Sequence, residues 1–203
     1  MTFIDLLTSQ LFVLGFIGLL VASITIREML LYKSGRKHHS NFKAGALPLT
    51  VLGIYAFVTG LYGQLTWPLP GSYNILFYDV YTLMGLLFIS LAWAMRSDLD
   101  TQHVGFFGLL IGLVTIYYGI VGYNIGLTTV PIALLGLYSL FGLAGVLSYP
   151  MTIMFDRATS GVRNRSIWWV VLVVAFLIAI IFGSLLAVFV AASAIPAHLL
   201  TTP

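Results

Sequence analysis

Six long apolar stretches, separated by short polar connections, constrain this chain more than any other feature. About 20 apolar residues are enough for a helix to cross a bilayer, and the stretches cover residues 6–26, 46–66, 74–95, 104–124, 129–154 and 167–193. Only 7 % of the 203 residues are charged, against about 25 % in soluble domains. The sequence therefore predicts an all-α, polytopic membrane bundle of six transmembrane helices, which forms a single integral membrane domain over residues 1–203.

The positive charges predict how this bundle is oriented. All nine Lys and Arg residues lie in the first, third and fifth connections: Arg27, Lys33, Arg36, Lys37, Lys43, Arg96, Arg157, Arg163 and Arg165. Short cytoplasmic connections carry an excess of Lys and Arg. We therefore expect these three connections in the cytoplasm and both termini outside. The basic residues are explained by topology and anionic lipid headgroups, so a nucleic-acid partner is not predicted.

An internal repeat relates the second and third stretches to the fourth and fifth. Glycines recur at the same spacing in the second and fourth stretches: Gly53, Gly60 and Gly63, then Gly112, Gly119 and Gly122. Tyr81-Thr-Leu-Met-Gly-Leu in the third stretch likewise matches Tyr138-Ser-Leu-Phe-Gly-Leu in the fifth. Small residues on one helix face allow a neighbouring backbone to approach closely. The pattern predicts a duplicated helix hairpin whose two copies run in parallel across the membrane, although spans rich in Gly and aromatic residues can also match by chance.

Asp79 is the one ionisable side chain set well inside an apolar stretch. A carboxylate at the centre of a membrane costs about 2.5–3.5 kcal/mol on insertion scales, so such residues usually face the protein interior and are candidates for function. Gly136 occupies the equivalent position in the second copy of the repeat, so the shared packing does not require the carboxylate. Two roles stay open: a functional site, or a structural residue that reaches the interface or is hydrogen-bonded to a neighbouring helix.

Other polar side chains are predicted close to Asp79, in the outer half of the bundle. The candidate intramembrane site consists of Asp79, Thr82, Tyr78, Gln64, Tyr118 and Asn124. Such a cluster could hold a cation, relay a proton or seat a quinone headgroup. The alternative is an aromatic belt, since tyrosines gather at membrane interfaces.

Several kinds of chemistry are excluded or disfavoured. The chain has no cysteine, which excludes disulfides, cysteine-ligated metals and thiol chemistry. His38, His39 and His103 lack the spacing of a metal site or the placement of a haem ligand within a span. No phosphate-binding loop and no lipase-type serine motif is present. We therefore predict no catalytic residue, metal or cofactor, and the chain is more consistent with a protein that is not an enzyme.

The length, the number of spans and the topology resemble those of small, six-span membrane proteins of prokaryotes that are grouped as a domain of unknown function. The resemblance covers the whole chain but includes no distinctive motif, so it carries over no functional residue. It implies a multi-pass protein of the prokaryotic cytoplasmic membrane.

Three functions remain open at this point. The first is a non-catalytic accessory or scaffold subunit of a membrane complex, in contact with other subunits or with a second copy of the chain. The second is a small cation- or proton-coupled carrier or channel that uses Asp79, which the repeat favours because many transporters are built from repeats. The third is a quinone- or haem-linked redox protein, which the placement of the histidines disfavours.

Overall fold

Six helices make up the computed structural model, which describes residues 6–34, 39–159 and 167–200. They are α1 (Leu6–Ser34), α2 (His39–Thr66), α3 (Ser72–Arg96), α4 (Gln102–Asn124), α5 (Pro131–Thr159) and α6 (Ile167–Leu200). Each contains a stretch long and apolar enough to cross a membrane. The predicted all-helical fold with six spans is confirmed.

One predicted helix end is wrong. The last apolar stretch was expected to end at residue 193, with Pro196 breaking the helix after it, but α6 continues through this proline to Leu200. A proline lacks the backbone N–H and leaves one carbonyl a turn earlier without its usual partner. Here that carbonyl belongs to Ala192, which is exposed. The lost hydrogen bond therefore falls at the end of the helix and not in its packed middle.

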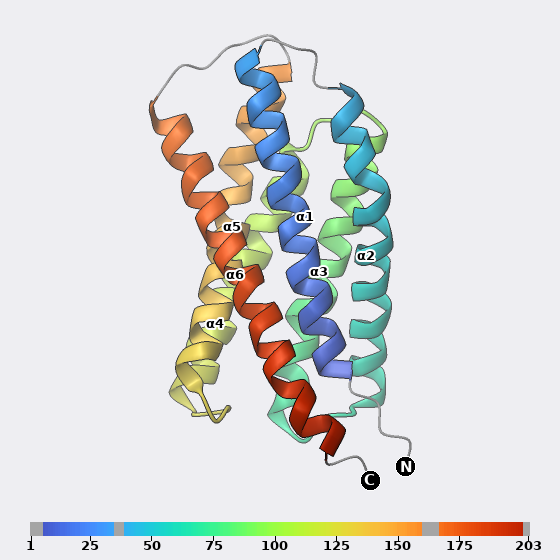
Figure 1. Ribbon diagram of the computed structural model, residues 1–203, viewed down its shortest axis with the longest axis vertical. Coiled ribbons are helices and arrows are strands. Elements are labelled where there is room, and N and C mark those ends of the chain that lie inside the picture. Colours follow the sequence, from blue (N-terminus) through green and yellow to red (C-terminus); the bar gives the residue numbers. More distant parts are fainter. Residues whose placement is uncertain (1–5, 35–38, 160–166, 201–203) are drawn as a thin grey trace.

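The helices form a closed ring in chain order. Each helix packs against the next one in the chain, and α6 returns to pack against α1 (Figure 1). The closest pairs are α2 with α3, α4 with α5, and α1 with α6. The bundle thus consists of three tightly packed antiparallel pairs arranged around a common centre.

The two ends of the bundle differ in charge. The ends of α1, α3 and α5 and the starts of α2, α4 and α6 lie together at one end, with the described side chains of Lys43, Arg96 and Arg157, and we call this the basic end. The start of α1, the end of α6 and the turns after α2 and α4 lie at the opposite end (Figure 1), which we call the neutral end. This arrangement follows from six spans whose Lys and Arg residues are confined to alternate connections.

Glycines set the register of the two repeated hairpins. In the first hairpin Gly85 of α3 packs against Phe57 of α2, and in the second Gly142 of α5 packs against Ile116 of α4. Ile116 follows Phe57 by 59 residues and Gly142 follows Gly85 by 57, which are the offsets of the glycine and tyrosine motifs in the sequence. The same helix register in both hairpins supports the predicted duplication.

Further contacts of the glycines agree with this register. Gly53 packs against the backbone of Ile89, and Gly112 against that of Val146, again 59 and 57 residues further on. Gly60 packs against Thr82 and Gly119 against Tyr138, a correspondence that is shifted by one residue. The repeat is therefore most regular in the middle of the hairpins and diverges towards the neutral end.

Hydrogen bonds from polar side chains connect the helix ends to neighbouring segments. At the neutral end the buried Asn74 donates from Nδ2 to the carbonyl oxygen of Gly63 over 3.1 Å, and its Oδ1 accepts from the N–H of Leu69 over 3.3 Å. At the basic end Asp156 of α5 accepts a hydrogen bond from the Thr101 hydroxyl at 2.9 Å and one from the N–H of Gln102 at 2.8 Å. A carboxylate at a helix N-terminus satisfies unpaired N–H groups, so Asp156 fixes the start of α4 against α5.

Candidate functional site

Asp79 joins three helices near the neutral end. Its Oδ1 accepts a hydrogen bond from Nε2 of Gln64 on α2 at 3.0 Å, and its Oδ2 accepts one from the hydroxyl of Tyr118 on α4 at 2.9 Å. All three side chains are partly buried. The structure thus brings together three of the six residues of the predicted site.

The other three residues do not contribute a hydrogen bond to this carboxylate. The hydroxyl of Thr82 donates to the carbonyl oxygen of Tyr78 at 2.7 Å, one turn back along its own helix. Tyr78 is fully buried and its ring covers the backbone of Gly63. Asn124 is exposed at the end of α4. Thr82, one turn after Asp79 on the same helix face, does not reach the carboxylate because a buried hydroxyl is satisfied most easily by its own backbone.

Asp79 also lies away from the centre of the ring. Phe88 lines the cavity described below, and it follows Asp79 by nine residues, about two and a half turns of helix. The carboxylate is therefore on the opposite side of α3 from the centre. Its position between α2 and α4 suits an acceptor that holds three helix ends together.

Asp79→Ala should destabilise the protein by about 1–3 kcal/mol, because it leaves the donors of Gln64 and Tyr118 without an acceptor. Asp79→Asn keeps one acceptor oxygen and should cost less than about 1 kcal/mol. Thermal unfolding of the purified variants measures the difference. Equal losses in both variants would show that the negative charge, and not its hydrogen bonds, is what matters.

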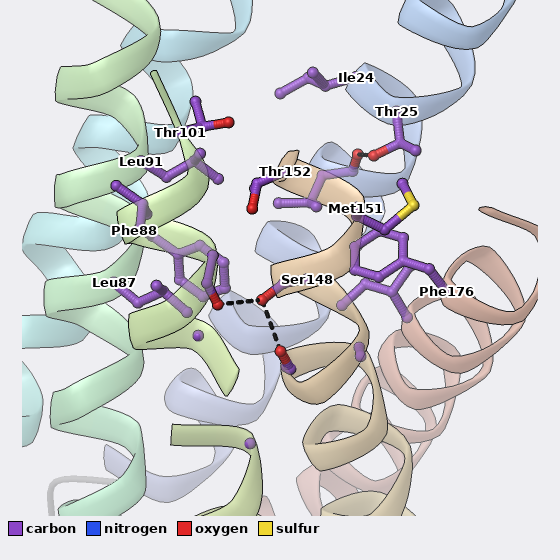
Figure 2. A pocket seen from close by; sticks show the side chains of 18 of the residues that line it. Ile24, Thr25, Leu87, Phe88, Leu91, Thr101, Ser148, Met151, Thr152 and Phe176 are labelled. Atoms are coloured by element: carbon purple, nitrogen blue, oxygen red, sulfur yellow. Dashed lines mark hydrogen bonds between the residues drawn. The ribbon is translucent and has the colours of Figure 1, made fainter. Parts of the chain in front are cut away.

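A cavity of about 130 Å³ lies at the centre of the ring, between the middle of the bundle and the basic end (Figure 2). All six helices contribute to its lining. Leu87, Phe88 and Leu91 of α3 face Met151 of α5 and Phe176 of α6 across it. The lining is almost entirely apolar, so the cavity provides space for apolar groups within the membrane-spanning part of the protein.

The few hydroxyl groups around this cavity are already satisfied. Each donates its one proton to a main-chain carbonyl or to Asp156: Thr25 to Val21 at 2.9 Å, Thr101 to Asp156 at 2.9 Å, Ser148 to Gly145 at 2.6 Å and Thr152 to Tyr149 at 2.9 Å. Ser148 also lies 3.1 Å from the carbonyl oxygen of Gly105. Water or an ion in a cavity needs several polar partners. These hydroxyl protons are not available to a water molecule or an ion. The lining is therefore suited to hydrocarbon.

A second, smaller cavity of about 40 Å³ continues towards the neutral end. Leu11 and Leu14 of α1 and Tyr81 of α3 are part of its lining. Met84 and Phe141 line both cavities. The two spaces are therefore neighbours along the axis of the ring, and these two side chains stand between them.

Neither cavity was predicted from the sequence. Their lining residues carry no motif, and the space exists only because side chains from six helices fail to fill the centre. One signal was present: Gly105, Gly108, Gly112 and Gly145 line the large cavity, and none of them has a side chain that could extend into it. The same glycines also bring α4 and α5 together, so their second role is visible only in three dimensions.

The predicted absence of a metal site can be compared with the described residues. Among them no group of three or more His, Asp or Glu side chains could hold a metal ion. His103 is exposed near the start of α4. His38 lies outside the described residues, and of His39 only the backbone, at the start of α2, is described.

A comparison with family models identifies the relatives of this chain. The model of a family described as "Protein of unknown function (DUF981)" matches residues 1–201, nearly the whole sequence. The chain belongs to the DUF981 family. The resemblance inferred from the sequence, to an uncharacterised six-span family, is confirmed. No curated protein and no solved structure matches the chain.

The DUF981 family description carries no activity. Together with the six apolar helices, it makes this chain a multi-pass membrane protein whose activity the comparison does not specify. Any function must therefore be argued from the geometry of the cavities and of the Asp79 contact.

Proposed function

We propose that this DUF981 protein is a non-catalytic membrane protein that holds a small apolar molecule, or the apolar part of a lipid, in its large cavity. The observation that carries the proposal is the cavity of about 130 Å³ to which all six helices contribute and which is lined almost entirely by apolar side chains. An apolar cavity of about 150 Å³ engineered into another protein stays dry and binds benzene or xenon. A similar space next to lipid hydrocarbon would be filled by a molecule of the same kind.

Native mass spectrometry tests this function. Protein released from membranes in a mild detergent should carry one non-covalently bound apolar molecule, which leaves on collisional activation. The identity of the released molecule gives the ligand class. Detection of the bare polypeptide alone, both from membranes and after reconstitution with total lipid extract, would contradict the proposal.

The carrier function receives less support from the geometry. A coupled carrier needs its carboxylate where a cation or proton can pass, but Asp79 lines neither cavity and bonds to two neutral donors. The hydroxyls around the large cavity give their protons to the main chain or to Asp156, so no row of free donors leads through it. These features favour a site for a neutral molecule.

The proposal includes the location of the protein. The basic end faces the cytoplasm, and both termini lie on the outer side of the cytoplasmic membrane, since Lys and Arg are confined to three alternate connections. Partners in the membrane, whether other subunits or a second copy of the chain, would contact the lipid-facing sides of the ring.

Reporter fusions test this orientation. A fusion after Leu99, in the turn between α3 and α4, should behave as cytoplasmic, and a fusion at the C-terminus as external. The expected contrast follows from the positive charge at the basic end. A cytoplasmic C-terminus would overturn the orientation and leave the fold unchanged.

A further inference from the structure

The side chain of Gln10 poses an unusual problem for a membrane protein. It lies in the second turn of α1, near the neutral end, and is only 2 % exposed. Neither its amide nitrogen nor its amide oxygen has a hydrogen-bond partner in the described part of the chain. Burial of an amide without partners is costly, and in a bilayer no bulk water can compensate. Because burying this amide without hydrogen bonds costs free energy, we expect it to pair with a group from outside the chain.

Gln10 lies on the side of α1 that faces the small cavity. Leu14, one turn further along, lines that cavity, as does Leu11, the next residue after Gln10. Side chains four residues apart share a helix face. Gln10 itself is not part of this lining. From its place one turn before Leu14 we infer that its amide lies just beyond the neutral-end border of the small cavity, within reach of a ligand that extends out of it.

The hydroxyl of Tyr81 adds a second polar group on the same cavity. Tyr81 lines the small cavity, and its hydroxyl is buried without a hydrogen bond from any described residue. Thr59 of α2 is within reach of this hydroxyl. Because the Thr59 hydroxyl donates its own proton to the carbonyl oxygen of Tyr55 at 2.7 Å, it can only accept from Tyr81, which leaves the Tyr81 oxygen able to accept from a ligand. The small cavity thus has the phenol of Tyr81 in its lining and the amide of Gln10 close to its border. The large cavity, by contrast, has an apolar lining whose few hydroxyl groups are already hydrogen-bonded.

The charges around the small cavity select the kind of polar group. No Lys or Arg lies at the neutral end of the described chain, so a carboxylate or phosphate would find no cation. Asp79, the charged side chain described in this half, is on the far side of α3 and bonded to Gln64 and Tyr118. An uncharged group that both donates and accepts, such as a hydroxyl, matches an amide and a phenol.

We propose that the ligand is a neutral amphiphile, a long apolar chain with a hydroxyl head, that binds along the axis of the ring. The head pairs with Gln10 and Tyr81 at the neutral end, and the chain passes between Met84 and Phe141 into the large cavity. Met84 has a flexible side chain that adapts to different packing, and its rotation would join the two spaces it now separates. This inference rests on the proposed function and adds the polarity and direction of the ligand.

Two photoreactive probes test this inference: a long-chain primary alcohol and the matching alkane, each with a diazirine at the far end of the chain. The protein is reconstituted in nanodiscs, irradiated and digested, and the labelled peptides are identified by mass spectrometry. We expect the alcohol to label peptides around Met151 and Phe176. Gln10→Leu should reduce this labelling about tenfold, the effect of losing one hydrogen-bonded contact of about 1.4 kcal/mol, and should leave the alkane unaffected.

Gln102→Leu is the matched control, because it makes the same chemical change at the start of α4, at the opposite end of the bundle from Gln10 and the small cavity. It should leave both probes unchanged. Gln10→Leu removes a buried amide without partners, so its thermal unfolding should occur at the same temperature or a higher one. Equal labelling by alcohol and alkane, or no effect of Gln10→Leu, would overturn the head-group assignment and leave the proposed function intact. Absence of cavity labelling by both probes would overturn both.

Discussion

Gly112→Ala should prevent the fourth and fifth helices from packing and leave little folded protein. A Cβ atom at this position would lie 2.5 Å from the carbonyl oxygen of Gly142 and 2.6 Å from the nitrogen of Val146. Both are backbone atoms of α5, so no side-chain rotation can relieve the contact. Overpacking of a well-packed interior typically costs about 1–3 kcal/mol, and because a whole helix must move here we expect at least about 3 kcal/mol.

The yield of monodisperse protein in detergent and its thermal unfolding measure this effect. Gly136→Ala provides the control on α5, since the nearest atom to its Cβ, in Leu186, is 3.7 Å away. Alanine is favoured over glycine within a helix by about 0.5–1 kcal/mol, so this variant should be as stable as the natural protein or slightly more so. If Gly112→Ala behaves like Gly136→Ala, the close approach of α4 and α5 is not as described.

The second large effect concerns ligand binding. Ala144 is 3 % exposed on α5 and lines the large cavity. A phenylalanine at this position would place a ring in the space that the proposed ligand occupies. Ala144→Phe should therefore reduce the amount of bound apolar molecule by about tenfold or more, the equivalent of at least about 1.4 kcal/mol, as measured by native mass spectrometry.

Ala192→Phe is the matched control, because Ala192 is exposed on α6 and the same change there meets only the surroundings of the protein. It should bind as the natural protein does. Both variants should elute as folded, monodisperse protein, so that a loss of ligand can be assigned to the filled cavity. Full retention of the ligand by folded Ala144→Phe would place the ligand elsewhere.

The helices could be predicted because the bilayer imposes them. A span needs about 20 apolar residues and must satisfy its own backbone, so composition alone gave the number and order of the six helices. The ends were less predictable. The second apolar stretch was expected from about residue 46, but α2 begins at His39, since a helix can continue beyond the apolar region in which it is required.

The repeat was predictable and the polar site only partly so. The equal spacing of the glycines that follow Gly53 and Gly112 predicts helix contacts, because a glycine allows the backbone of the facing helix to approach closely. Asp79 was identified because placing a carboxylate within the membrane costs free energy. Gln64 and Tyr118, which donate hydrogen bonds to it, were both among the residues expected to lie near it. Thr82 shows what the sequence does not predict. Its helix face follows from the sequence, but the atom to which its hydroxyl donates, the carbonyl oxygen of Tyr78, does not.

The cavities and Gln10 required the structure. An empty space depends on the shapes of side chains from six helices, and no single segment encodes it. Gln10 was not singled out in the sequence, since a glutamine in the second turn of a helix is usually able to reach the interface. Its burial without partners becomes visible only when the neighbouring helices are in place.

Crystals of the protein pressurised with xenon test the central claim, a dry apolar cavity inside the ring, most directly. Xenon enters apolar cavities of this size and is a strong scatterer. In crystals of protein from which the bound molecule has been removed, we expect a xenon atom in the large cavity, in contact with Phe88, Met151 and Phe176, and none there in crystals of Ala144→Phe. Ordered water molecules in this space, or side chains that close it completely, would contradict the account.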